Sequence, residues 1–248
     1  MSGSLYKDYW RFGFKTRLYD LMSPWGYIQS IRSSVEHLKI VPGDRILDVG
    51  CGTGGALPFI IPFLFSGECE YYGVDILSEG LKVAKGKAGK FARNKKAKFI
   101  KTNITEPLPF DAGSVSKALA HFSVYTLSNR KERLAAWRGI YAVLEPGGML
   151  VAANPALSYD PKTIIQDSML NVKKEEGIGA FLFARIFYPF TRRMGLEHIK
   201  RQLDRNIWHA YSLEDFKEEL EETGFIFLKS ERVYCDSGLL IAVEKNSL

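Results

Sequence analysis

Three glycines at alternating positions, Gly50, Gly52 and Gly54, directly follow a short apolar run that ends at Val49. Glycine lets a backbone approach a ligand closely, and the first turn of a following helix presents unpaired N–H groups. Asp48 stands two positions before the first glycine, where its charge repels a phosphate and attracts an ammonium group. A pyrophosphate-binding loop instead favours the spacing Gly-x-Gly-x-x-Gly. The loop therefore predicts a site for a nucleoside that carries an amino group.

A second acidic residue, Asp75, ends another apolar run, at residues 70–74. A carboxylate at the end of the second strand of such a fold accepts hydrogen bonds from both hydroxyls of a ribose. Dinucleotide-dependent enzymes use the same arrangement, so Asp75 alone does not separate NAD from S-adenosylmethionine. The glycine spacing and Asp48 favour S-adenosylmethionine.

The stretch from Leu47 to Gly54, Leu-Asp-Val-Gly-Cys-Gly-Thr-Gly, resembles the signature motif of class I S-adenosylmethionine-dependent methyltransferases. The resemblance extends from about Val41 to Lys245 and implies a Rossmann-like sheet, S-adenosyl-L-methionine as cofactor and methyl transfer as the reaction. Residues 101–110 resemble the segment that contacts adenine, with an asparagine where many members carry Asp. The resemblance implies that these residues contact the cofactor: Asp48, Gly50, Cys51, Gly52, Gly54, Asp75, Ile76, Asn103 and Ile104.

Two further positions follow from the same resemblance. Residues 118–125 resemble the segment that lies between cofactor and acceptor, and within them we predict that His121 is a catalytic base and a cofactor contact. Packing against adenine and capping of a strand are its alternatives. Tyr19 resembles an N-terminal lid element that contacts the cofactor, although core packing of that amphipathic segment explains it equally well. Cys51 is interpreted as a small loop residue and not as a reactive thiol.

The elements that must position these side chains form a regular pattern. Short apolar runs rich in β-branched residues alternate with segments of helical spacing, which is typical of a parallel α/β sheet. The last two runs are joined by residues 234–238, too short a link for a parallel crossover, so we expect them to pair antiparallel. The prediction is a doubly wound, mostly parallel sheet of seven strands that ends in an antiparallel hairpin. The predicted strands are 45–49, 70–74, 98–102, 115–120, 149–153, 225–233 and 239–244, and the predicted helices are 53–65, 78–91, 130–144 and 213–223.

Two segments lie outside this pattern. Residues 1–40 are dense in aromatic side chains, and residues 154–210 contain the apolar run 179–190. We expect both to close over a cofactor-binding core, 41–153, and to shape an apolar pocket for a small-molecule or lipid-like acceptor. The run 179–190 and its arginines either lie on a membrane surface or pack on the core with the arginines outward. Residues 211–248 complete the sheet with a helix and the hairpin.

The chain of 248 residues has a formal net charge of +6, and residues 82–101 hold nine basic and no acidic side chains. We interpret this stretch as a solvated helix face and loop, with attraction to anionic lipid headgroups or nucleic acid as the alternative. The three cysteines are too scattered for a disulfide framework or a zinc site. A start unlike a secretory leader, and apolar runs well short of about 20 residues, predict a cytoplasmic protein.

Two other functions fit parts of the pattern. One is an NAD-dependent oxidoreductase, and the other is a regulatory protein that binds the cofactor without turnover. A nucleic-acid acceptor is less favoured, because Ala-His-Phe-Ser follows the fourth strand in place of an Asn/Asp-Pro-Pro-Tyr-type motif. The sequence therefore predicts methyl transfer to a small, hydrophobic or lipid-like acceptor.

Overall fold

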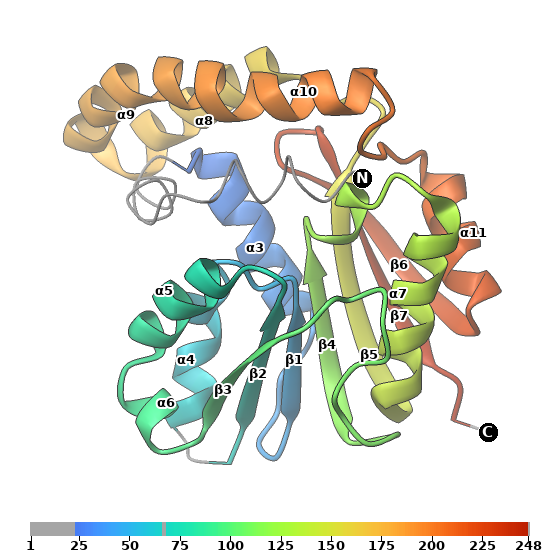
Figure 1. Cartoon of the computed structure of the whole chain (residues 1–248). Helices are drawn as coiled ribbons and strands as arrows, with labels where there is room; N and C mark the ends of the chain where they lie inside the picture. Colours follow the sequence, from blue (N-terminus) through green and yellow to red (C-terminus); the bar gives the residue numbers. More distant parts are fainter. Residues whose placement is uncertain (1–22, 66–67, 248) are drawn as a thin grey trace.

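The computed structural model describes residues 23–65 and 68–247, which are built around one seven-stranded sheet (Figure 1). The strands are β1 (Arg45–Val49), β2 (Glu70–Asp75), β3 (Ala97–Lys101), β4 (Val115–His121), β5 (Leu144–Pro155), β6 (Phe225–Val233) and β7 (Gly238–Lys245). Their order is β3-β2-β1-β4-β5-β7-β6, and only the pairs that involve β7 are antiparallel. The order reverses between β1 and β4, which is where a doubly wound sheet binds its ligand. The predicted fold class is confirmed.

The strand that departs most from its predicted bounds is β5, which begins at Leu144 and not at residue 149. Leu144 pairs with Val115, and the ladder resumes only where Met149 pairs with Lys117. The Pro-Gly-Gly stretch at residues 146–148 is therefore an irregularity inside the strand, at which Gly147 has a φ of +73°.

Two helices flanking the sheet also differ from the prediction. Helix α4 (Leu57–Phe65) starts later than the predicted residue 53, because Gly52 and Gly54 have φ angles of +52° and +75°, outside the α-helical region. The helix predicted over 78–91 is divided into α5 (Ser78–Ala88) and α6 (Lys90–Arg93) by Gly89, whose φ is +54°. The remaining helices around the sheet are α3 (Trp25–His37), the short η1 (Val124–Thr126), α7 (Arg130–Val143) and α11 (Leu213–Glu222).

A buried ion pair joins α7 to α11. Arg133 Nη2 lies 2.7 Å from Glu219 Oε1, and both side chains are almost fully enclosed. The Glu219 carboxylate also accepts hydrogen bonds from the Tyr211 hydroxyl at 2.9 Å and from Trp137 Nε1 at 3.3 Å. A buried pair holds only when such additional hydrogen bonds satisfy it. This network ties the segment before α11 to the helices beside the sheet.

The segment between β5 and α11 forms three helices and a π-helical turn: α8 (Pro161–Glu175), α9 (Gly177–Thr191), η2 (Arg192–Leu196) and α10 (Glu197–Asp204). Figure 1 shows them above the carboxyl ends of the parallel strands. Asp160 caps α8, since its carboxylate accepts hydrogen bonds from the backbone N–H groups of Lys162 and Thr163. The insertion therefore lies over the edge of the sheet where a ligand is expected.

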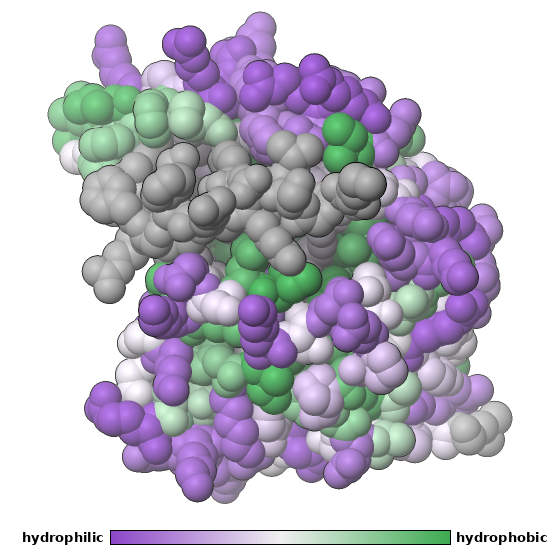
Figure 2. Space-filling view, viewed as in Figure 1, coloured by the Kyte–Doolittle hydropathy of each residue, from purple (hydrophilic) through white to green (hydrophobic). Residues whose placement is uncertain are grey.

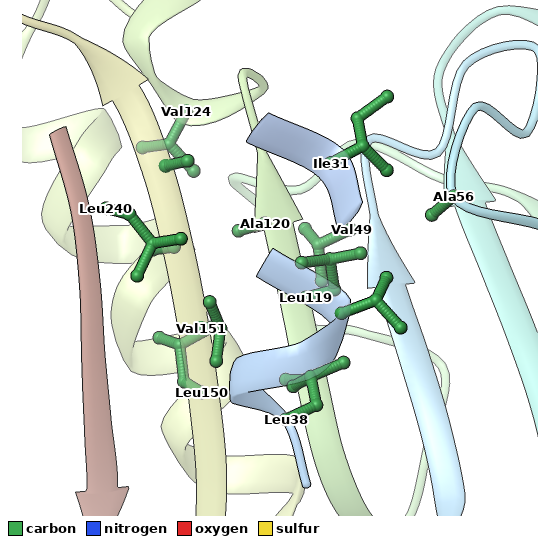
Figure 3. Packing of buried hydrophobic residues seen from close by; sticks show 14 of the residues in the cluster. Ile31, Leu38, Val49, Ala56, Leu119, Ala120, Val124, Leu150, Val151 and Leu240 are labelled. Carbon is green, nitrogen blue, oxygen red and sulfur yellow. The ribbon is translucent and has the colours of Figure 1, made fainter. Parts of the chain in front are cut away.

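Apolar packing fixes α3 over the middle of the sheet. Figure 3 shows Ile31 of this helix and Leu38, the residue that follows it, beside Val49 of β1, Leu119 of β4 and Val151 of β5, all of them buried. At its other end, α3 meets the insertion, because the backbone N–H of residue 26 donates to the Ser168 hydroxyl of α8 at 3.0 Å. Helix α3 thus connects the core to the elements above the sheet.

Candidate functional site

The glycine loop after β1 is held against the end of β2. The backbone N–H groups of Gly50 and Cys51 both donate to the Val74 carbonyl, at 2.8 and 3.0 Å. Gly50, Gly52 and Gly54 have φ angles of +74°, +52° and +75°, a region that side chains rarely allow. No heavy atom lies within 4 Å of the point where a Cβ of Gly52 would stand. The loop therefore presents bare backbone with open space above Gly52.

Asp75, predicted to hold a ribose, is oriented by the backbone around it. One carboxylate oxygen accepts the Gly52 N–H at 2.8 Å, and the other accepts the Leu77 N–H at 2.7 Å. Burial raises the pKa of Asp75, and these hydrogen bonds act in the opposite direction. Because a carboxylate oxygen accepts more than one hydrogen bond, both oxygens keep capacity for ribose hydroxyls. Asp75 thus lies against the glycine loop, and its role in holding a ribose stays a prediction.

Asp48 lies inside the fold, with 3% of its surface exposed. Its carboxyl accepts a hydrogen bond of 2.7 Å from the hydroxyl of Tyr71, a β2 residue that the sequence reasoning missed. The pKa of Asp48 is raised to about 7, mainly by burial and to a smaller extent by the charge of Asp75, while the Tyr71 hydrogen bond opposes the rise. Asp48 is therefore a proton-binding group under the loop. The signal of Tyr71 in the sequence is weak, because β2 also contains the polar side chains of Glu70 and Tyr72.

Cys51 is also buried, and burial raises the pKa of its thiol well above the usual value. A thiol that stays protonated is a poor nucleophile. A Cβ added at Gly73 would lie 2.9 Å from the Cys51 sulfur, so this glycine leaves room for the side chain. The packing agrees with the interpretation of Cys51 as a small loop residue.

The remaining predicted cofactor contacts lie after β2 and β3. Ile76 is 36% exposed, and Asn103 and Ile104 are half-buried. The Asp75 carbonyl accepts the Thr102 N–H at 3.0 Å, which brings the two strand ends together. Asn103 Oδ1 accepts the N–H of residue 105. These residues thus share the carboxyl edge of the sheet with Asp75. Tyr19 lies outside the described residues.

His121, the predicted base, ends β4 and is enclosed by α3. Its Nε2 lies 2.9 Å from the Ser30 hydroxyl oxygen, and that hydroxyl donates to the Tyr27 carbonyl at 2.7 Å. Because the hydroxyl has a single proton, His121 Nε2 carries the hydrogen that it shares with Ser30. Burial lowers the pKa of His121 to about 3. The imidazole is therefore neutral at physiological pH and binds a proton weakly.

The two residues after His121, Phe122 and Ser123, form a strained loop that packs against the glycine loop. Phe122 has a φ of +50°, a strained conformation for a bulky side chain and one that concentrates at functional sites. A Cβ at Gly50 would lie only 2.3 Å from the Ser123 Cβ, so the loop after β4 packs directly on the glycine loop. The Phe122 ring lies 6.0 Å from that of Tyr27, 6.1 Å from that of Tyr125 and 5.3 Å from that of Tyr234.

Three buried polar atoms near Tyr125 have no hydrogen-bond partner among the residues that the structure describes: Ser123 Oγ, Asn154 Nδ2 and His209 Nε2. Asn154 Oδ1 accepts the Tyr125 N–H at 3.2 Å, and the Tyr125 carbonyl accepts the His209 N–H at 2.8 Å. Burial lowers the pKa of His209, and so does the charge of Arg133. Unsatisfied polar atoms are rare in folded proteins and mark places where a ligand or water binds. We name this group and its aromatic neighbours Phe122 and Tyr125 the polar cluster.

The described residues thus bring a glycine loop, a ribose-type carboxylate and the polar cluster to one edge of the sheet. Residues 46–148 of the chain match the model of a protein family described as a methyltransferase domain. This range contains the glycine loop, Asp75, Asn103 and His121, but ends before the insertion.

Two curated relatives and one solved structure illustrate the similarity. A carboxy-S-adenosyl-L-methionine synthase of Desulfotalea psychrophila is 25% identical over 212 residues, which cover 82% of this chain and 78% of the synthase. An uncharacterized protein of Methanocaldococcus jannaschii is 31% identical over 157 residues, 63% of this chain and 55% of that protein. The structure of a SAM dependent methyltransferase from Aquifex aeolicus aligns with a TM-score of 0.61 at 15% identity, over 94% of this chain and 98% of that one. At that identity, the structural likeness concerns the fold.

Proposed function

This chain is a class I S-adenosylmethionine-dependent methyltransferase by its fold and its methyltransferase domain, and we propose that its acceptor is a small, largely apolar molecule with one polar group. The observation that carries the proposal is the polar cluster, in which buried hydrogen-bonding atoms without partners stand among aromatic rings beside the glycine loop.

The glycine loop and Asp75, at the carboxyl edge of the sheet, fit the cofactor. The Asp75 carboxylate would accept hydrogen bonds from the ribose hydroxyls, and the open backbone at Gly52 would leave room for the nucleoside. S-adenosylmethionine supplies a methyl group that its sulfonium has already activated. The protein then needs to align the acceptor with that methyl group and to exclude water.

We assign acceptor recognition to residues at the end of β5 and in the segments that follow β4 and β5. The aromatic rings around Phe122 offer apolar contact, and the amide of Asn154 and the imidazole of His209 offer hydrogen bonds to a single polar group. A buried donor without a partner costs about 1–3 kcal/mol, which an acceptor with a matching group recovers on binding. The cluster thereby favours an acceptor that pairs with it over a purely apolar one.

The first experiment identifies the acceptor. The purified protein is incubated with a cell extract and methyl-labelled cofactor, and products heavier by one methyl group are sought by mass spectrometry. We expect a labelled small molecule. Labelling confined to nucleic acid or protein contradicts the proposal, and bound cofactor without any labelled product indicates a regulatory protein. The same spectra detect a cofactor heavier by a carboxyl group, the product that the name of the Desulfotalea psychrophila relative indicates.

A variant then locates the pocket. His209→Phe keeps a ring at the edge-on contact with Tyr211, 4.4 Å between ring centroids, but removes the free Nε2. We expect a KM for the identified acceptor raised by roughly tenfold, the effect of one lost buried hydrogen bond, with cofactor affinity unchanged. The matched control is His37→Phe, since His37 lies at the far end of α3 beside Glu231. Equal kinetics for both variants place the acceptor elsewhere.

A further inference from the structure

Helix α9 exposes an apolar face. Ile178, Leu182, Ile186 and Phe190 recur every four residues, and between 50% and 71% of the surface of each is exposed. Phe183 and Met194 add to the same exposed apolar surface. Figure 2 shows this surface as a continuous hydrophobic area at the end of the molecule formed by α9. An exposed patch of this kind marks an interaction surface in a folded protein.

Internal packing does not require this face. Helix α9 buries another stripe, Ala184, Tyr188 and Thr191, and it contacts α8. The Tyr188 hydroxyl accepts a hydrogen bond of 2.9 Å from the backbone N–H of Trp25, which fixes the rotation of the helix. The orientation of α9 is therefore set by its buried stripe, and the apolar side chains opposite remain on the surface.

The charges on α9 and η2 themselves have one sign. Residues 177–196 contain three arginines and no acidic residue, while Glu175, Glu176 and Glu197 flank this stretch. Arg192 pairs with Glu197 at 2.9 Å, whereas Arg185 and Arg193 are exposed and make no ion pair within the described ranges. Exposed arginines beside a large apolar surface complement an anionic surface that also accepts apolar side chains.

From these observations, we propose that the exposed face of α9 docks onto the surface of a bilayer that contains anionic phospholipids. Leu182, Ile186 and Phe190 enter the boundary between headgroups and acyl chains, and Arg185 and Arg193 contact phosphate groups. A symmetric contact between two copies of the chain through this face would place the arginines of both copies at one interface. Their repulsion disfavours a second copy as the partner of this face. Within residues 23–65 and 68–247, no helix is long and apolar enough to cross a membrane. The proposal is independent of the acceptor, although α8, α9 and α10 lie over the edge that holds the site (Figure 1).

Vesicle co-sedimentation of the full chain tests the apolar part. The probes are phosphatidylcholine vesicles and vesicles in which about a third of the lipid is phosphatidylglycerol. We expect binding to the mixed vesicles that is weakened by salt, and a loss of roughly tenfold or more in Leu182→Ser/Ile186→Ser. The matched control is Ile226→Ser/Leu228→Ser, which removes two exposed apolar side chains of β6 and leaves binding unchanged. Cofactor affinity, measured for every variant, reports that each is folded.

Substitutions of basic residues test whether α9 and η2 or the basic stretch 82–101 bind the anionic vesicles. Arg185→Gln/Arg193→Gln should weaken binding to the mixed vesicles by roughly tenfold or more, given the contribution expected of each basic residue near an anionic surface. Lys85→Gln/Arg93→Gln, which lie in α5 and α6, should leave it unchanged. The proposal is overturned if only Lys85→Gln/Arg93→Gln loses binding. It is also overturned if the wild-type chain binds neither type of vesicle. Sedimentation equilibrium tests the remaining alternative. If the wild-type chain is a dimer and the variant Leu182→Ser/Ile186→Ser is a monomer, the face of α9 binds a second copy of the chain and not a membrane.

Discussion

Asp48 and His121 are buried side chains whose proton affinities move in opposite directions. Burial raises the pKa of Asp48 to about 7 and lowers that of His121 to about 3. In both cases the low-dielectric surroundings disfavour the charged form. Near neutral pH, Asp48 is thus partly protonated and His121 is uncharged. Each makes a different, measurable contribution to the pH dependence of this protein.

Asp48 predicts a pH-dependent cofactor affinity. A cationic amino group bound nearby favours the carboxylate, so binding releases a proton wherever free Asp48 is protonated. We expect affinity for S-adenosylmethionine to rise with pH up to about 7, by at most about tenfold per pH unit, and then to level off. Calorimetry at several pH values, in buffers of different ionisation enthalpy, measures both the affinity and the released proton.

Asp48→Asn is the control for this effect, because an amide does not titrate. Its affinity should be lower at pH 7.5 and nearly independent of pH. A wild-type protein whose affinity does not change between pH 5.5 and 7.5 shows that Asp48 does not sense the charge of the cofactor. Its role is then confined to the hydrogen bond with Tyr71.

A role of His121 as catalytic base predicts that His121→Asn lowers turnover by roughly tenfold or more and leaves cofactor affinity within about threefold of wild type. Because the pKa of His121 is about 3, the wild-type pH-rate profile should have no limb from this residue between pH 5 and 8. Steady-state kinetics with the identified acceptor checks both. Unchanged turnover in the variant removes His121 from the catalytic residues and leaves it as a partner of Ser30.

The same variant gives a second readout through stability. The folded pKa of His121 is below the unfolded value of 6.5, so its stabilising contribution is present above pH 6.5 and is lost as the pH falls toward 3. His121→Asn removes this loss. Between pH 6.5 and 4, the unfolding free energy of the variant should therefore fall less steeply with decreasing pH than that of wild type. The two slopes should differ by up to about 1.4 kcal/mol per pH unit. Urea unfolding across this range measures the difference in slope.

Among the elements, the glycine loop and the loop after β4 constrain each other. Both follow strands at the point where the sheet order reverses, and Gly50 meets Ser123 with no room for a side chain. Asp75 holds the same glycine loop from the other side through the Gly52 N–H. A change in one of these loops should therefore be felt in cofactor binding and in stability alike.

Two alanine substitutions separate strain from steric conflict in this loop. Gly50→Ala combines a positive φ with a contact of 2.3 Å to the Ser123 Cβ, whereas Gly52→Ala has the positive φ but open space. We expect Gly52→Ala to cost about 1 kcal/mol of unfolding free energy and Gly50→Ala about 2–4 kcal/mol. Urea unfolding without cofactor measures both. Equal costs contradict the packing of Ser123 on Gly50.

At the scale of the whole molecule, the carboxyl edge of the sheet gathers residues from four strands, α3 and the insertion. Ligand binding there should stabilise the fold, because a ligand that binds only the folded chain adds its binding free energy to stability. The effect is global, since α3 links this edge to the core through Ile31 and Leu38.

Thermal unfolding should therefore separate the cofactors. At about 100 times its dissociation constant, S-adenosylmethionine or its demethylated product adds about 2.7 kcal/mol, which raises Tm by roughly 5–10 °C for a chain of this size. NAD at the same concentration should leave Tm unchanged. A rise with NAD alone contradicts the assignment of the cofactor.

The fold class and the position of the glycine loop could both be predicted from the sequence. The signals for both are local: alternating apolar runs specify strands, glycines specify where the backbone turns, and a short link forces the last two strands to pair antiparallel. Asp75 followed from the same logic, because the end of the second strand always meets the glycine loop in this sheet order.

The partners of these residues could not be predicted from the sequence. The partner of Asp48 is a tyrosine of the next strand, the partner of His121 is a serine of α3, and the polar cluster joins residues from three separate segments. Periodicity also could not tell which apolar face of α9 is buried, because the helix is apolar on both sides. Such contacts depend on how segments far apart in the chain pack together, and a single sequence carries no local signal for that packing.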